Sequence, residues 1–166
     1  TASKFPTQMD PAYLAQSSIG QYEVAATPLQ MLMVASAIAN NGVLMKPHVV
    51  KSVTGSDLKV IQTVQPEQAG RPISEGAAKQ LKQMMENVVS DGTGSPAQVR
   101  GMTIGGKTGT AQSDPNRPPY AWFVGYATEP HVAVVTFVQS TSVERNDISG
   151  GKVAAPVFKA VVESLR

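Results

Sequence analysis

The residues with the clearest chemical potential lie within one short stretch, residues 101–112. Lys107 supplies a fixed positive charge suited to a carboxylate. Gly109 carries no side chain and leaves room for a substrate to approach the backbone. Two interpretations compete. Residues 101–108 match the phosphate-binding loop pattern G-x-x-x-x-G-K-T, whereas Lys107-Thr108-Gly109-Thr110 also suits an edge strand beside an active site.

The residues on either side of this stretch disfavour a phosphate-binding loop. Such a loop follows a buried apolar strand and opens a helix, whose N-terminus helps to hold the anion. Residues 94–100, Gly-Ser-Pro-Ala-Gln-Val-Arg, do not form an apolar strand. After the stretch, Pro115, Pro118 and Pro119 exclude a helix of useful length. No later apolar strand ends in an aspartate that could hold magnesium, so we do not expect nucleotide binding.

Strand geometry is better supported, and it fixes which side chains share a face. Thr103, Ile104 and Ala111 favour a strand over about residues 102–112, and apolar runs at 121–127 and 132–139 supply two more strands. Residues 128–131 join those runs tightly enough for an antiparallel hairpin. Because side chains alternate along a strand, Lys107 and Gly109 are expected on one face and Thr108 and Thr110 on the other.

Helices and a second hairpin are predicted around this sheet. Helix starts are expected at Thr27-Pro28 and at Ser74, a short helix at Pro11, and a last helix from about Val153 to Leu165. The Thr27 helix is apolar on nearly all sides and is expected to be buried, and residues 48–64 indicate a β-hairpin. The expected core faces are Ala77, Leu81, Met84, Met85 and Val88, then Val157, Phe158, Val161 and Leu165. The fold class is α+β, an antiparallel sheet flanked by helices.

Several separated motifs occur along the chain: Ile19-Gly20-Gln21, Thr27-Pro28-Leu29-Gln30, Gly92-Thr93-Gly94, Lys107-Thr108-Gly109-Thr110, and residues 150–158. Their order is that of class B penicillin-binding proteins, and the chain resembles that family from about residue 13 to its end. In detail it is similar to the penicillin-binding protein A type. Motifs in order are far more specific than K-T-G alone. The resemblance implies part of a transpeptidase fold of the penicillin-binding protein and serine β-lactamase kind.

The resemblance also implies an activity and roles for particular residues. The family are peptidoglycan D,D-transpeptidases: a serine attacks stem peptides ending in D-Ala-D-Ala, and β-lactams acylate the same serine. By similarity, Lys107 supports proton transfer and the anionic end of the substrate, and Thr108 and Thr110 bind its carboxylate. The backbone N–H of Thr110 is an oxyanion donor, and Gly109 keeps the site open. Two roles remain open for Trp122: packing in the core or at its rim, and direct contact with the substrate.

The family's other motifs are missing. No S-x-N triplet occurs, and the S-x-x-K at Ser56-Asp57-Leu58-Lys59 falls in the predicted hairpin turn, out of family order. A nucleophile and its lysine must share one face of a helix, where positions i and i+3 are neighbours. Residues 1–166 are therefore expected to be the C-terminal part of a single transpeptidase domain. The S-x-x-K and S-x-N motifs would lie upstream, so these residues alone are predicted to be inactive.

Composition excludes several classes of partner. The chain has 166 residues, which is long enough for one folded domain. Of these residues 42% are hydrophobic and 16% charged, as in a globular protein. Its net charge of +2 is dispersed, which argues against nucleic acid. His48 and His131 have no other ligand at metal-binding spacing, so neither a metal nor a cofactor is expected.

Expected partners are stem peptides, β-lactams, the upstream half of the domain, and division or elongation proteins. The expected location is the outer face of the cytoplasmic membrane, with an anchor elsewhere.

Other functions on the same fold remain open at this point. One is a non-catalytic β-lactam-sensing or scaffold module, which would have a substituted serine upstream. Another is a serine β-lactamase, which needs a deacylating base that cannot be recognised in these residues. The third alternative, a nucleotide-binding enzyme, is not on this fold; it would bind nucleotide with magnesium, and no such binding is expected.

Overall fold

The computed structural model describes residues 2–8, 10–112 and 116–166. The elements, in chain order, are α1 (Pro11–Ser18), α2 (Pro28–Ala39), β1 (Leu44–Met45), β2 (Ser52–Thr54), β3 (Val60–Thr63), β4 (Gln68–Gly70), α3 (Glu75–Asp91), η1 (Ser95–Ala97), β5 (Ile104–Ala111), β6 (Tyr120–Ala127), β7 (Val132–Val138), η2 (Arg145–Asp147), η3 (Gly150–Ala154) and α4 (Ala155–Glu163). The predicted α+β class is confirmed.

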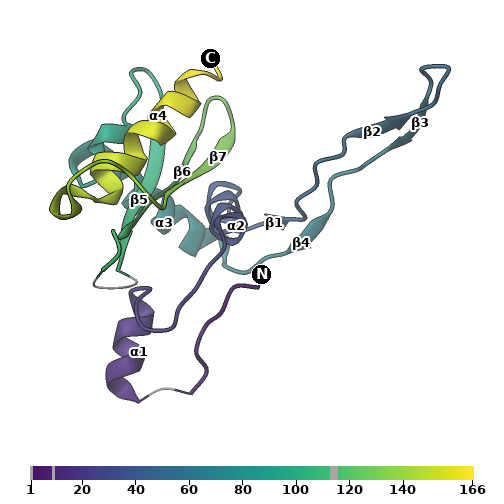
Figure 1. Ribbon diagram of the computed structural model, residues 1–166. Helices are drawn as coiled ribbons and strands as arrows, with labels where there is room; N and C mark the ends of the chain where they lie inside the picture. Colours follow the sequence, from purple (N-terminus) through teal and green to yellow (C-terminus); the bar gives the residue numbers. More distant parts are fainter. Residues whose placement is uncertain (1, 9, 113–115) are drawn as a thin grey trace.

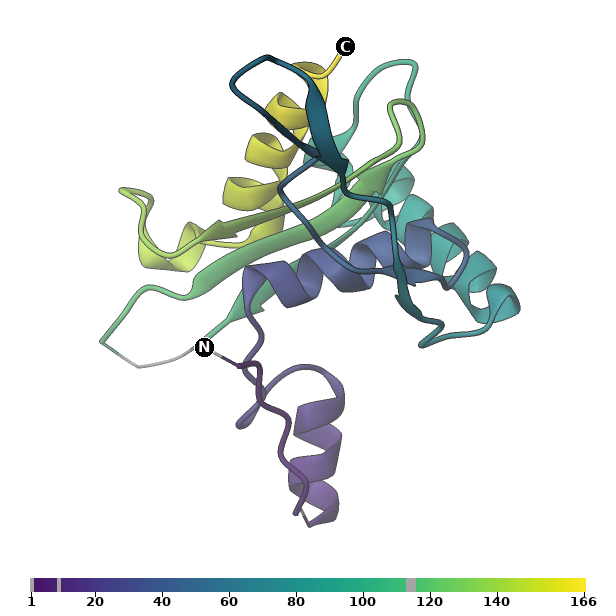
Figure 2. The same cartoon turned by 90° about the vertical axis from the view of Figure 1, so that its right-hand side faces the viewer.

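The central sheet has the strand order β5-β6-β7 and is antiparallel throughout. Strands β5 and β6 pair along their whole length without a register shift. Helix α4 covers one face of the sheet, while α2 packs on the other face against β6 and β7 and α3 packs along β5 (Figures 1 and 2). The predicted hairpin through residues 128–131 is confirmed. Because the strand order is β5-β6-β7, β5, which carries the K-T-G-T residues, lies at an edge of this sheet.

Helix α2 starts where the sequence predicts but is less buried than predicted. The Thr27 hydroxyl accepts a hydrogen bond from the Gln30 N–H at 3.1 Å, and Pro28 occupies the first turn. The expectation of full burial was wrong, because Leu29 is 53% and Val34 40% exposed. Only the side that packs on the sheet is buried, and it includes Ala35 and Ile38.

The inward faces of α3 and α4 differ from the predicted faces by about one residue. Ser74 caps α3 as predicted, with its hydroxyl accepting from the Ala77 N–H. Met85 is buried and Leu81 packs beside it as predicted, but Met84 is 59% exposed. In α4, Phe158 is buried as predicted, whereas Val157, Val161 and Leu165 are exposed. The residues that α3 and α4 bury most are Ala78, Met85 and Val89, then Ala155, Phe158 and Val162. Neighbouring i, i+4 lines on one helix are both apolar, and the sheet selects one of them.

The predicted hairpin at residues 48–64 is confirmed as β2 and β3, which project away from the body of the protein (Figure 1). The sequence did not predict the short β1–β4 pair at its base. Ser56 and Lys59 lie in the hairpin turn, where the Lys59 ammonium pairs with Asp57 at 3.2 Å. A backbone hydrogen bond from Lys59 holds the Asp57 pKa below its usual value. The S-x-x-K tetrad is thus an exposed turn and not a nucleophile pair on a helix.

The N-terminal segment forms a small separate cluster. Asp10 caps α1 by accepting a hydrogen bond from the Tyr13 N–H at 2.8 Å, and the rings of Tyr13 and Tyr22 stack at 4.3 Å. A bridge between Lys4 and Ala25 ties this segment to the start of α2. Within the described ranges, no helix has the length and apolarity needed to cross a membrane.

Two clusters of buried residues hold the sheet between the helices. On the α4 face, Phe123 and Phe158 are fully buried with ring centroids 4.7 Å apart. On the other face, Tyr126 is buried beside Ile38 and Met85. Its hydroxyl donates to the Glu86 carboxylate at 3.1 Å, and burial together with this carboxylate raises the Tyr126 pKa well above its usual value.

Loss of stability at alkaline pH is expected to depend on Tyr126. An unfolded tyrosine ionises near pH ~10, while the folded one keeps its proton, so the folded state binds this proton more tightly. The contribution is complete below about pH 10 and is lost as pH rises above it. Tyr126→Phe should cost about 1 kcal/mol near neutral pH and should flatten the alkaline decline in urea unfolding. Tyr13→Phe, at an exposed tyrosine, is the control, and an equal decline in both variants would contradict this assignment.

Candidate active site

Strand β5 passes from a buried half to an accessible half. Ile104, Gly105 and Gly106 are buried, whereas Lys107 and Thr110 are exposed and Thr108 and Gly109 are half-buried. The accessible half lies at the sheet edge, where no other described strand pairs with it. A phosphate-binding loop is excluded, because residues 104–111 form a strand that continues toward the hairpin partner β6 and not into a helix.

Two glycines let the buried half of β5 lie against large aromatic residues. A Cβ on Gly105 would lie 2.4 Å from the Tyr126 ring, and one on Gly106 would lie 2.3 Å from the Phe123 ring. Such contacts are far shorter than van der Waals distances. The Tyr126 and Phe123 rings therefore lie against opposite faces of β5. They fix the position of its buried half, which precedes Lys107.

The hydroxyls of the two threonines each have a partner from another part of the chain. The Thr108 hydroxyl lies 2.8 Å from that of Thr93, which follows α3. The Thr110 hydroxyl accepts a hydrogen bond from the Gly150 N–H at 3.4 Å. A hydroxyl that accepts a hydrogen bond still has its own proton to donate. The Thr110 hydroxyl can therefore still donate its proton to an anion. The Thr108 hydroxyl can do the same when the Thr93 hydroxyl donates to it.

Lys107 adds a positive charge to the same strand edge. Its Nζ donates to the Thr108 carbonyl at 2.7 Å, which uses one of its three protons. The predicted alternation holds at Thr108, Gly109 and Thr110. Both threonines face Thr93 and Gly150, whereas a Cβ on Gly109 would point toward the Trp122 Cβ, 3.3 Å away. An ammonium and two hydroxyl donors on one open edge can bind a carboxylate by charge-assisted hydrogen bonds.

Gly150 and Gly151 bring the start of the C-terminal helical segment against β5. A Cβ on Gly150 would lie 2.7 Å from the Gly109 carbonyl oxygen and 2.8 Å from its nitrogen. A Cβ on Gly151 would lie 2.4 Å from the Thr93 carbonyl oxygen. The Ser149 hydroxyl caps this segment by accepting from the Lys152 N–H at 3.2 Å. The segment after α3 and the start of η3 thus meet at the K-T-G-T strand.

Trp122 lies opposite Gly109 in the β5–β6 register. It is half-buried, and its ring packs on Phe137 with centroids 4.4 Å apart. Part of the loop expected to overhang the site, residues 113–115, lies outside the described residues. In the parts of the chain that the structure describes, no three His, Cys, Asp or Glu side chains gather as metal ligands.

Sequence reasoning did not assign Thr93 and Gly150 to the site. Each belongs to a motif that the sequence showed, Gly92-Thr93-Gly94 and the Gly150-Gly151 pair. The available signal was a glycine-flanked threonine after one helix and a glycine pair before another. Neither pattern predicts which strand the segment will contact in the folded protein.

Known proteins resemble this chain over nearly its whole length. The family of penicillin binding protein transpeptidase domains matches residues 4–163. The chain belongs to this family. A structure of penicillin-binding protein A from Mycobacterium tuberculosis, an acyl-enzyme complex with penicillin G, superposes with a TM-score of 0.86 at 36% identity, covering 100% of this chain and 38% of that one.

Curated relatives in the family are similar over the same region. The peptidoglycan D,D-transpeptidase PbpA of Mycolicibacterium smegmatis is 41% identical over 159 residues, which is 93% of this chain and 32% of the relative. Stage V sporulation protein D of Bacillus subtilis is 32% identical over 164 residues, 95% of this chain and 25% of that protein. The chain therefore spans about a third or less of the length of these penicillin-binding protein relatives.

Proposed function

We propose that this chain is the C-terminal part of the transpeptidase domain of a peptidoglycan D,D-transpeptidase that β-lactams acylate. The observation that carries the proposal is the open edge of β5, where Lys107, Thr108 and Thr110 offer an ammonium and two hydroxyls. The names of the relatives and the acyl-enzyme neighbour support it. The domain would act on the outer face of the cytoplasmic membrane, with division or elongation proteins as further partners.

The proposed reaction uses a serine outside these residues. Its oxygen forms a bond to the carbonyl carbon of the penultimate D-alanine, the C–N bond to the terminal D-alanine breaks, and the proton lost by the serine hydroxyl passes to the leaving amine. An amine of a neighbouring strand then bonds to the same carbon, the C–O bond to the serine breaks, and the proton lost by that amine returns to the serine oxygen. Thr108 and Thr110 hold the terminal carboxylate, Lys107 supports the proton transfer and the negative charge, and the Thr110 N–H stabilises the oxyanion. Gly109 leaves space for the substrate, and Trp122 borders it.

The rest of the domain would also cover apolar surface that this chain leaves exposed. Leu29 and Val34 of α2 are 53% and 40% exposed. Helix α2 is apolar on nearly all sides, and a helix of this kind is normally buried, so its exposed side chains suit a surface that another element covers. We assign that cover to the upstream half of the same domain, which brings the S-x-x-K helix and the S-x-N motif to the edge of β5.

Labelling with a fluorescent penicillin tests the proposal. The full-length protein, in which the rest of the domain accompanies these residues, should form a covalent adduct that survives denaturation. Residues 1–166 alone should not. An unlabelled full-length protein would overturn the proposed function, and a labelled fragment would overturn the placement of the nucleophile outside it.

The Thr93 hydroxyl should matter for the rate of acylation. Thr93→Val removes the partner of the Thr108 hydroxyl, and the second-order rate of acylation of the full-length protein should fall by about threefold to tenfold. Thr93→Ser keeps the hydroxyl and should stay close to wild type. Equal rates in all three proteins would show that Thr93 does not position Thr108.

A further inference from the structure

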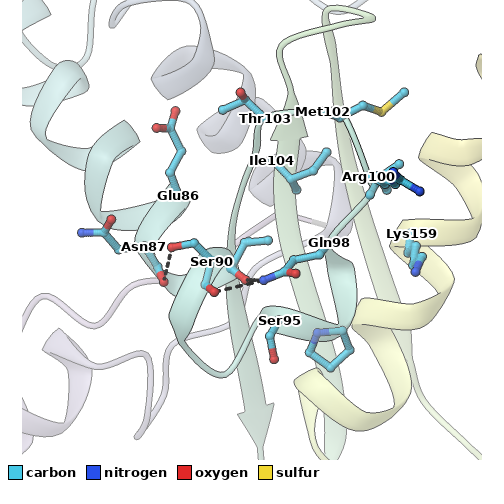
Figure 3. Close-up of a pocket in the computed structure, with 13 residues that line it drawn as sticks. Glu86, Asn87, Ser90, Ser95, Gln98, Arg100, Met102, Thr103, Ile104 and Lys159 are labelled. Atoms are coloured by element: carbon cyan, nitrogen blue, oxygen red, sulfur yellow. Dashed lines mark hydrogen bonds between the residues drawn. The ribbon is translucent and has the colours of Figure 1, made fainter.

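A groove lies behind the K-T-G-T strand, between the end of α3, the η1 turn, the start of β5 and α4 (Figure 3). Its volume is about 860 Å³. It opens at the N-terminal end of β5, whereas Lys107–Ala111 form the other end of that strand. The proposed transpeptidase reaction does not use it.

Its charged side chains leave positive charge available. Arg100 and Lys159 lie on one side of the groove and Glu86 on the opposite side (Figure 3). The Arg100 guanidinium has no hydrogen bond or ion pair with the described part of the chain, and the Lys159 ammonium is 3.9 Å from Glu163. Glu86, the one acidic side chain among the described lining residues, is engaged by the Tyr126 hydroxyl. The described lining thus carries two cations and one carboxylate; Lys159 is shared with Glu163, so Arg100 is the cation most available to a ligand.

The floor of the groove is already covered within this chain. Val89, Val99 and Ile104 are only 3%, 4% and 5% exposed, so this surface needs no further domain to bury it. Pro96 and the half-buried Met102 provide accessible apolar contacts beside them. An occupant therefore meets an apolar patch next to a pair of cations, with side-chain oxygens of Ser95 and Thr103 at the border.

We propose that this groove binds the C-terminal end of a short peptide with an apolar last side chain. Arg100 binds the free carboxylate through its two parallel N–H donors, and Lys159 adds a second positive charge. The last side chain packs on Met102 and Pro96. An amide in place of the carboxylate would lose both charge-assisted contacts, so the free carboxylate is the feature that the groove selects.

One side chain of the groove connects it to the proposed active site. Gln98 donates from Nε2 to the carbonyls of Val89 and Ser90, at 2.7 and 3.0 Å, and so holds the last turn of α3 (Figure 3). Thr93 follows that turn and contacts the Thr108 hydroxyl. A peptide that displaces Gln98 changes the position of Thr93, and with it the carboxylate-binding end of β5. This consequence rests on the proposed function, whereas peptide binding itself does not.

Fluorescence anisotropy on the full-length protein tests the site. The probe is fluorescein-labelled Leu-Leu with a free C-terminal carboxylate, and the same dipeptide with a C-terminal amide is the control ligand. Affinity for the carboxylate form should fall by about tenfold in Arg100→Gln and in Lys159→Gln. Lys79→Gln, at an exposed lysine of α3, should bind as wild type does. Protein already acylated by penicillin should still bind, because this groove is not the acylation site.

Each outcome has a defined consequence. Equal binding of the carboxylate and the amide, or unchanged binding in Arg100→Gln and Lys159→Gln, overturns the site. Loss of binding after acylation also overturns it, because the peptide then occupies the transpeptidase site. Saturating peptide should change the acylation rate of wild type at least about threefold but not that of Arg100→Gln; binding without that change overturns the link through Gln98. Failure of penicillin to label peptide-free protein counts against the proposed function alone.

Discussion

Replacing Lys107 by glutamine is expected to lower the acylation rate of the full-length protein by about 10²–10³-fold. The ammonium is the positive charge on the accessible half of β5, and among the residues that the structure describes only the Thr108 carbonyl uses one of its three protons. Glutamine can keep that hydrogen bond but cannot stabilise negative charge that develops on the substrate. The rate is measured as the second-order constant for a fluorescent penicillin.

Two further variants make the Lys107 result specific. Lys107→Arg keeps the charge but has a planar head group, so it should retain only part of the rate. Lys79→Gln removes an exposed lysine on α3 and should leave the rate unchanged. Because Lys107 is exposed, all three variants should unfold at the same urea concentration as wild type. A Lys107→Gln protein that is acylated within twofold of wild type would refute the assigned role.

The second large effect is expected at Gly150, where alanine should impair both folding stability and acylation. Its Cβ would lie 2.3 Å from the Trp122 carbonyl oxygen and within 2.8 Å of two backbone atoms of Gly109. Backbone atoms cannot rotate away as the end of a side chain can. The sheet or the η3 segment must shift, at a cost of about 1–3 kcal/mol, and the shift displaces the hydroxyl of Thr110.

Gly76→Ala is the matched control for this variant. Gly76 lies in α3, and a Cβ there would have no neighbouring atom within 4 Å, so alanine should stabilise the helix by up to about 1 kcal/mol. Urea unfolding and acylation are measured on both proteins. If Gly150→Ala matches wild type in both assays, the close packing of η3 on β5 does not position the site.

The starts of the helices and the strand order were predictable because each depends on local chemistry. A capping hydroxyl followed by proline marks the start of α2, and a capping serine marks α3. Helix faces were less predictable. In α4 the apolar line through Phe158 and Val162 runs beside another through Val157 and Val161, and only contact with the sheet decides which is buried.

The site was predictable where it lies within one strand and not where it depends on distant segments. Lys107, Thr108, Gly109 and Thr110 are consecutive, so their alternation follows from strand geometry. The partners of the two threonines lie 15 and 40 residues away along the chain. No spacing rule links such positions, because their contact is created by the packing of α3 and η3 against the sheet.

The division of β5 into a buried and an accessible half bears on how drug resistance can arise. Residues 104–106 support the aromatic core, so substitutions there endanger folding. Lys107, Thr108 and Thr110 contribute little to that core. Under the proposed function, mutations at the accessible half can alter recognition of a β-lactam without a large loss of stability. Different residues of β5 therefore control drug affinity and folding, so selection by antibiotics can act on the first without disturbing the second.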